Sequence, residues 1–99
     1  MLDKLTITDF RPYINQTFRI HVDGLEPVDL ELVSVTEAGR ASQTDARNPF
    51  SLLFIGPVSP QYLPQHIYRL EHADMGVLEL FLVPLGPEEG RMRYEAIFT

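Results

Sequence analysis

Residues 49–57 read PFSLLFIGP, and this stretch decides the fold. In an extended chain, alternation puts three large apolar side chains on one side: Phe50, Leu52 and Phe54. The other side carries Leu53 and Ile55, so both sides of the segment are apolar. Proline and glycine bound it, as is typical of a short strand. We therefore expect a central strand with one side in the core and a second side that needs a cover.

Five further segments alternate with a period of two residues, which predicts five more strands: Phe18–Val22, Val28–Glu37, His66–His72, Val77–Val83 and Met92–Phe98. In the second of them the phase changes at Leu32 and Val33, which predicts a bulge followed by Val33 and Val35 as the apolar pair. Polar residues 38–48 indicate a loop, and prolines place residues 56–65 in an extended connection. Residues 84–90 (PLGPEEG) predict a turn.

One short helix is predicted at residues 8–15, with Thr8 as its N-cap and Asn15 in a left-handed C-terminal position. The chain is therefore expected to be all-β with this single helix. A six-stranded antiparallel meander would close as a small barrel or a compact sandwich, because an open sheet this apolar would leave one face uncovered. We favour the barrel, as one domain over residues 1–99.

Charge and composition limit the partners. The 99 residues carry a formal net charge of -6 and no cysteine, which excludes disulfides and thiolate chemistry. The arginines are scattered singly, so no basic patch favours nucleic acid or an anionic membrane. The start MLDKLTITDF has no signal-peptide pattern, and no run of apolar residues is long enough for a membrane helix. We expect a cytoplasmic protein that binds neither nucleic acid nor membrane.

Motifs for catalysis are absent. His21, His66 and His72 are candidate metal ligands, with Glu71 or Asp74 as a further donor. However, His66 and His72 lie six positions apart on one strand, roughly 20 Å at 3.3 Å per residue, which is too far for one ion. Glu71 and Glu79 share a face with Arg69, which is typical of a solvated charge face. There is no nucleophile elbow or phosphate loop, so we expect no catalytic residue, cofactor or metal.

The sequence is compatible with two kinds of binding surface. The outward sides of the third and fifth strands carry four apolar residues that form a candidate protein interface: Leu53, Ile55, Phe81 and Val83. The alternative for this face is cover from within the chain, by the helix together with Tyr62 and Leu63. A second candidate site is the barrel mouth, where a small molecule, or a metal-dependent reaction, would use four polar groups: His66, Tyr68, His72 and Tyr94.

Several blocks together resemble a family of bacterial proteins of about this length that is itself a domain of unknown function: Asp9, Phe10 and Pro12 near the N-terminus, then PFSLLFIGP, YRLEH (68–72), MGVLELFLVPLGP (75–87) and MRYEAIF (92–98). The resemblance covers nearly the whole chain. Members are found near phage tail-collar-like or tail-fibre-like proteins, which implies an accessory role in such an assembly. We therefore expect a non-enzymatic module that binds a protein partner or associates with itself, with a small-molecule binder as the alternative.

Overall fold

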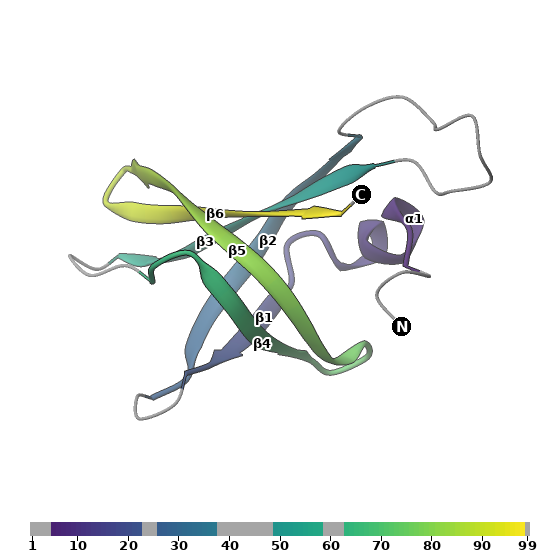
Figure 1. Cartoon of the computed structure of the whole chain (residues 1–99), viewed down its shortest axis with the longest axis horizontal. Coiled ribbons are helices and arrows are strands. Elements are labelled where there is room, and N and C mark those ends of the chain that lie inside the picture. The colour runs from purple at the N-terminus through teal and green to yellow at the C-terminus, as the bar shows by residue number, and fades with distance from the viewer. Residues whose placement is uncertain (1–4, 23–25, 38–48, 59–62, 99) are drawn as a thin grey trace.

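The computed structural model describes residues 5–22, 26–37, 49–58 and 63–98, and every structural statement below concerns these residues. Six strands and one short helical segment confirm the all-β prediction (Figure 1). The elements are α1 (Ile7–Phe10), the 3-10 turn η2 (Arg11–Tyr13), β1 (Thr17–His21), β2 (Val28–Glu37), β3 (Phe50–Val58), β4 (His66–His72), β5 (Gly76–Glu88) and β6 (Arg91–Phe98).

The six strands form a closed antiparallel barrel in the order β1-β2-β3-β6-β5-β4, with β1 also paired to β4. The barrel, rather than the sandwich, is therefore the observed architecture. The order is not a simple meander, which would pair β3 with β4. Instead β3 pairs with β6, and β4 returns to lie beside β1 in a Greek key. Closure buries one side of every strand without a second sheet.

Alternating side chains fill the barrel. Phe50, Leu52 and Phe54 of the opening stretch are fully buried, as their spacing predicts. They meet inward-facing residues of the other strands, among them Phe18, Ile20, Leu30, Leu32, Leu70, Leu80, Leu82 and Ala96. An eight-stranded barrel is only just wide enough for side chains to fill, so a six-stranded one holding these residues has a packed interior. The core accounts for the stability of the fold.

Three register shifts interrupt the strand pairing, in β2, β3 and β5, and the last two change the predicted strand limits. The expected bulge in β2 is present, because its register with β3 shifts between Leu32 and Ser34. Val33 is the extra residue, however, and it is exposed, whereas Val35 pairs with Leu52 and faces the core. The prediction that Val33 joins the core was therefore wrong, since a bulge turns its extra residue out of the alternation.

Prolines do not end β3 and β5 where the sequence suggests. β3 continues through Pro57 to Val58, and β5 continues through Pro84 to Glu88, each past a register shift. A bulge leaves a residue out of the hydrogen-bonded ladder, which accommodates a residue without an N–H. The turn predicted over residues 84–90 is consequently reduced to Glu89 and Gly90, both with positive φ.

The N-terminal helix is shorter than residues 8–15 and starts earlier. Thr6, not Thr8, is its N-cap, and the Thr6 N–H donates to the Asp9 carboxylate at 2.7 Å. Asn15 has φ of 72°, which confirms the left-handed position. Figure 1 shows α1 beside the C-terminal end of β6, where Phe10 packs against Phe98 at the end of the barrel.

Two predicted features lie outside the described residues: the loop at 38–48 and the covering role of Tyr62. Leu63 is described, and it is partly buried against the core. Among the described residues, no helix has the length and apolar character needed to cross a membrane.

Candidate functional site

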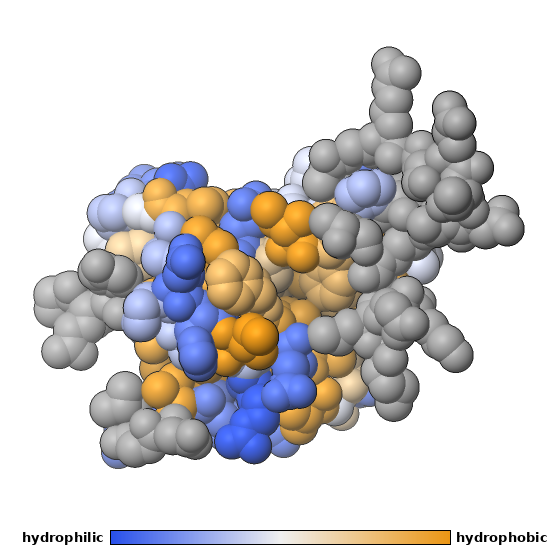
Figure 2. Space-filling model, in the orientation of Figure 1, coloured by the Kyte–Doolittle hydropathy of each residue, from blue (hydrophilic) through white to orange (hydrophobic). Residues whose placement is uncertain are grey.

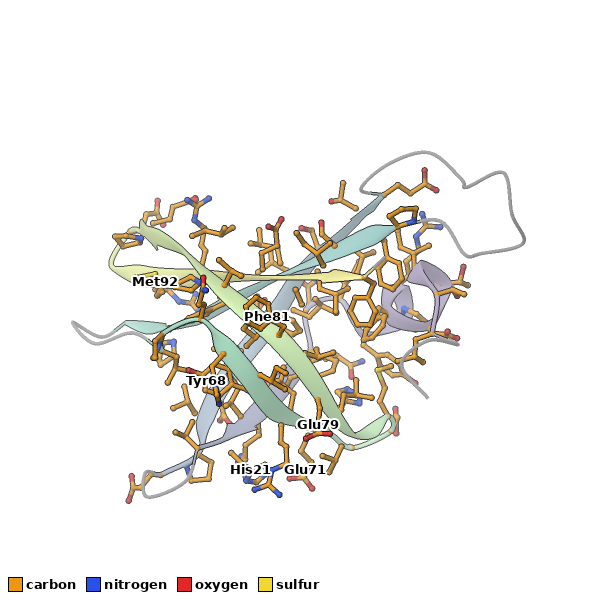
Figure 3. All side chains as sticks on the ribbon, viewed as in Figure 1. His21, Tyr68, Glu71, Glu79, Phe81 and Met92 are labelled. Carbon is orange, nitrogen blue, oxygen red and sulfur yellow. The ribbon has the colours of Figure 1, made fainter. Side chains whose placement is uncertain are left out.

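Apolar side chains gather on the outward face of β4, β5 and β6 (Figure 2). Ile67 on β4 lies directly opposite Phe81 on β5, and their exposed fractions are 57% and 49%. Figure 3, in the same view, places Phe81 in the middle of this face. An aliphatic and an aromatic side chain facing each other across two strands contribute favourable packing, yet about half of each remains in contact with solvent.

The register extends this surface across the next two strands. Val83 follows Phe81 on the same side of β5 and lies opposite Glu95 on β6. Glu95 in turn lies opposite Leu53 on β3. Ile97, which is 58% exposed, is two residues beyond Glu95 on the same side of β6. We call the five apolar members the apolar patch: Leu53, Ile67, Phe81, Val83 and Ile97.

The four predicted interface residues all face outward, but to different extents. Phe81 is well exposed, while Leu53, Ile55 and Val83 are half-buried by their neighbours. The helix is placed at the end of the barrel, where Phe10 contacts Phe50 and Phe98. Its buried residue therefore faces the inward side of β3 rather than the side that carries Leu53.

Several exposed apolar residues were not singled out from the sequence. They are Val33, Ile67, Val77, Leu85 and Ile97. Alternation assigns Ile67 to the outer side together with Arg69 and Glu71, so its direction was available. What the pattern lacks is the strand order, which brings β4, β5 and β6 together as one continuous surface.

The four residues predicted at a barrel mouth do not meet in one site. His66, Tyr68 and Tyr94 lie near the start of β4, whereas His72 is the last residue of that strand. Tyr68 and Tyr94 lie together: the Tyr68 hydroxyl donates to the Pro64 carbonyl at 2.6 Å, and the Tyr94 hydroxyl accepts the Leu63 N–H at 2.8 Å. His66 packs edge-on against Tyr68, with ring centroids 5.5 Å apart. The two hydroxyls thus hydrogen-bond to the backbone of Leu63 and Pro64, which precede β4.

Burial shifts both of these tyrosines in the same direction. Desolvation raises the pKa of Tyr68, and the neighbouring Tyr94 raises it further. Desolvation also raises the pKa of Tyr94, although the hydrogen bond from Leu63 acts in the opposite direction. Both phenols are therefore neutral at physiological pH, where they act as structural hydrogen-bonding groups.

His72 lies four residues further along β4, at the end of the barrel closed by the helix. Its Nδ1 accepts the Asp74 N–H at 3.0 Å, so the proton is assigned to Nε2, which donates to Gln16 at 2.7 Å. The ring packs against Tyr13 and Phe18. His72 is thus buried with both ring nitrogens hydrogen-bonded, and it does not lie in one site with Tyr68 or Tyr94.

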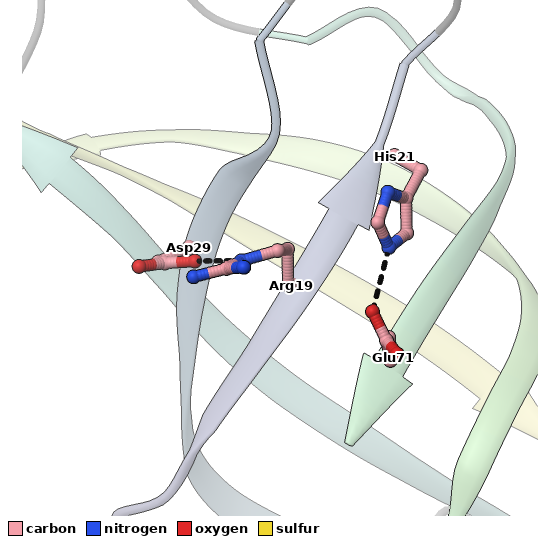
Figure 4. Close-up of polar contacts among 4 residues, drawn as sticks. All are labelled: Arg19, His21, Asp29 and Glu71. Atoms are coloured by element: carbon pink, nitrogen blue, oxygen red, sulfur yellow. Dashed lines mark hydrogen bonds and ion pairs between the residues drawn. The ribbon is translucent and has the colours of Figure 1, made fainter. Parts of the chain in front are cut away.

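Charged residues form a second surface feature, on the outward side of β2, β1 and β4 (Figure 4). Arg19 Nε donates to Asp29 Oδ1 at 3.1 Å, and His21 Nε2 lies 2.9 Å from Glu71 Oε1. The four side chains are 38–57% exposed, so solvent screens both pairs and each contributes about 0–1 kcal/mol. Glu79 lies opposite Arg69, which agrees with the predicted charge face.

Two open hollows accompany these charges. One, of about 350 Å³, is lined by Thr17, Arg19, Asp29, Glu71 and Ala73. The other, of about 540 Å³, is lined by His21, Val22, His66, Ile67, Tyr68, Arg69 and Glu79. Within the described part of the chain, no group of three histidines or carboxylates is arranged to hold a metal ion.

Comparison with known proteins places this barrel in a family. No curated protein and no solved structure gives a significant match to the chain. A family model described as a domain of unknown function, DUF6916, matches residues 5–98. That range includes α1 and all six strands, so the chain belongs to the DUF6916 family.

Proposed function

We propose that this domain is a non-enzymatic module that binds another protein through the apolar patch. The observation that carries the proposal is the facing pair of Ile67 and Phe81, each about half exposed on the β4–β5 side of that patch. Contiguous apolar surface of this kind is typical of protein interaction sites. Aromatic residues such as Phe81 are also enriched at the energetic centres of interfaces.

The charge of the chain favours a different protein over a second copy. Each copy carries a formal net charge of -6, so two copies repel one another at low ionic strength. A partner with basic residues around an apolar surface is attracted by the same charge, and its association is accelerated. The partner surface that binds the patch therefore carries positive charge, either throughout or around its edge.

The interior of the barrel gives less support to a small-molecule binder. Its inward side chains are buried, with exposed fractions near zero for ten of the largest. The hydroxyls of Tyr68 and Tyr94 are both occupied by backbone groups. A ligand in the barrel would have to displace packed side chains, whereas a protein on the apolar patch displaces only water.

The resemblance described above supports a more specific role. In it, the domain is an accessory component of a phage-tail-like or fibre assembly in the cytoplasm of a bacterium, and the partner is a protein of that assembly. The proposal of protein binding through the apolar patch does not depend on this role.

Capture followed by reconstitution tests the proposal. The tagged domain captures proteins from its native host, and each captured protein is then purified and mixed with the wild type, Phe81→Glu or Val33→Glu. Val33 is the matched control because it is exposed and apolar but lies on β2, outside the patch. We expect Phe81→Glu to abolish the complex and Val33→Glu to retain it.

Two results would overturn the proposal. One is a reconstituted complex that both variants weaken equally. The other is light scattering that shows a wild-type dimer dissociated by Phe81→Glu, which would assign the patch to a second copy. Circular dichroism of each variant verifies that the barrel is folded.

A further inference from the structure

Glu95 occupies an unusual position inside the apolar patch. On β6 it lies between Leu53 of β3 and Val83 of β5, which are its direct cross-strand neighbours. Ile97 follows on the same side of the strand, and the Glu95 side chain is itself half-buried. A single carboxylate is thus surrounded on three sides by apolar groups.

The cations nearest along the strand are already engaged elsewhere. Arg93 forms an ion pair with Glu88 at 3.4 Å, and its Nε donates to the Gly86 carbonyl at 3.5 Å. Arg91 Nε donates to the Gly56 carbonyl at 2.7 Å. No hydrogen bond or ion pair joins the Glu95 carboxylate to another residue in the ranges described.

Covering the patch would remove water from this carboxylate. An ionised carboxylate that is buried without a partner costs several kcal/mol, because hydration is lost and nothing replaces it. A purely apolar partner is therefore disfavoured at this point of the surface. A cation placed against Glu95 offsets the cost and makes the contact specific.

We infer that the partner presents an arginine or lysine side chain to Glu95, flanked by apolar groups that contact Leu53 and Val83. The inference rests on the proposed function, since it specifies the chemistry of the surface that occupies the same patch. Arginine suits the position best, because its planar guanidinium pairs with a carboxylate through two hydrogen bonds and is weakly hydrated.

Three small probes separate charge from apolar contact. They are the acetylated and amidated tripeptides Val-Arg-Val, Val-Glu-Val and Val-Met-Val, titrated to millimolar concentration into the labelled domain while backbone amide NMR signals are followed. We expect Val-Arg-Val to shift the signals of Leu53, Val83 and Glu95. The glutamate peptide leaves them unchanged, and the methionine peptide shifts them only weakly.

Variants then assign the effect to one carboxylate. Glu95→Gln keeps the shape of the side chain and removes its charge, so the affinity for Val-Arg-Val falls by about tenfold, as for a hydrogen bond to a charged group. Glu79→Gln is the matched control, because Glu79 is an outward carboxylate on β5 that lies opposite Arg69. The control retains the wild-type affinity.

Three outcomes overturn the inference. They are equal shifts with the methionine and arginine peptides, equal loss of affinity in both glutamine variants, and no shift at these three positions with Val-Arg-Val. None of them decides the proposed function, which is judged by the effect of Phe81→Glu on the reconstituted complex.

Discussion

The rings of Phe50 and Phe98 stack face to face, with centroids 4.6 Å apart and planes inclined by 7°. Phe10 packs against both, at 5.9 Å and 5.4 Å. Three aromatic residues from the helix, the start of β3 and the end of β6 thus close one end of the barrel. Segments far apart in the sequence are held together there by one cluster.

Removing the central ring of this cluster should destabilise the whole domain. Phe10 is fully buried, so Phe10→Ala leaves a cavity and lowers the free energy of unfolding by about 3–5 kcal/mol. Urea denaturation measures the change, with Phe81→Ala as a control because that ring is half exposed. A loss below about 1 kcal/mol for Phe10→Ala would show that the helix is not part of the core.

His72 should contribute through its hydrogen bonds more than through its ring. His72→Phe preserves the aromatic packing but leaves the Asp74 N–H and the Gln16 side chain without their partner. We expect a loss of about 1–3 kcal/mol in the free energy of unfolding. Gln16→Ala removes only the bond at Nε2 and leaves those that Nδ1 accepts from the Asp74 and Met75 N–H groups, so it should cost less. Equal losses in the two variants would contradict this explanation.

High pH should weaken the fold through the two buried tyrosines. The folded-state pKa values of Tyr68 and Tyr94 lie above the ordinary value of tyrosine. These two tyrosines therefore leave the free energy of unfolding unchanged below about pH 10, and they lower it as the pH rises beyond that value. Denaturation at a series of alkaline pH values measures the slope. In Tyr68→Phe and in Tyr94→Phe the slope decreases, and an unchanged slope in both variants would refute the assignment.

The turn between β5 and β6 can be improved. Glu89 has φ of 52° and Gly90 has φ of 80°, and this pair of positive values is typical of a two-residue hairpin turn that favours Asn-Gly. Glu89→Asn should raise the free energy of unfolding by about 0.5–1 kcal/mol, since asparagine tolerates the left-handed region. Glu89→Val is the opposing control and should destabilise. Thermal denaturation that ranks the two in reverse order would exclude this turn.

Alternation in the sequence predicted which side of β3 is buried. Phe50, Leu52 and Phe54 have the strict spacing of a core-facing strand, and the structure buries all three. The limits of a strand were harder to predict where a bulge interrupts its hydrogen bonding to the neighbouring strand. Pro84 was expected to end a strand, but the register shift beside it lets β5 continue, and this depends on the partner strand β6.

The apolar patch was only partly predictable for a similar reason. The outward direction of Phe81 and Val83 follows from local spacing. The neighbours that complete the patch, and the apolar surroundings of Glu95, depend on β5 lying between β4 and β6. Local sequence shows which way a side chain points, whereas its exposure is determined by residues that are distant in the chain.

Closure of the barrel also limits how any partner can be recognised. Along β3, residues 50–55 are paired with β2 on one side and with β6 on the other, so another chain cannot add a strand there. A partner over this part of the barrel is therefore recognised through outward side chains. A few outward substitutions on β3 to β6 would therefore change the surface offered to a partner, while the backbone scaffold stays the same.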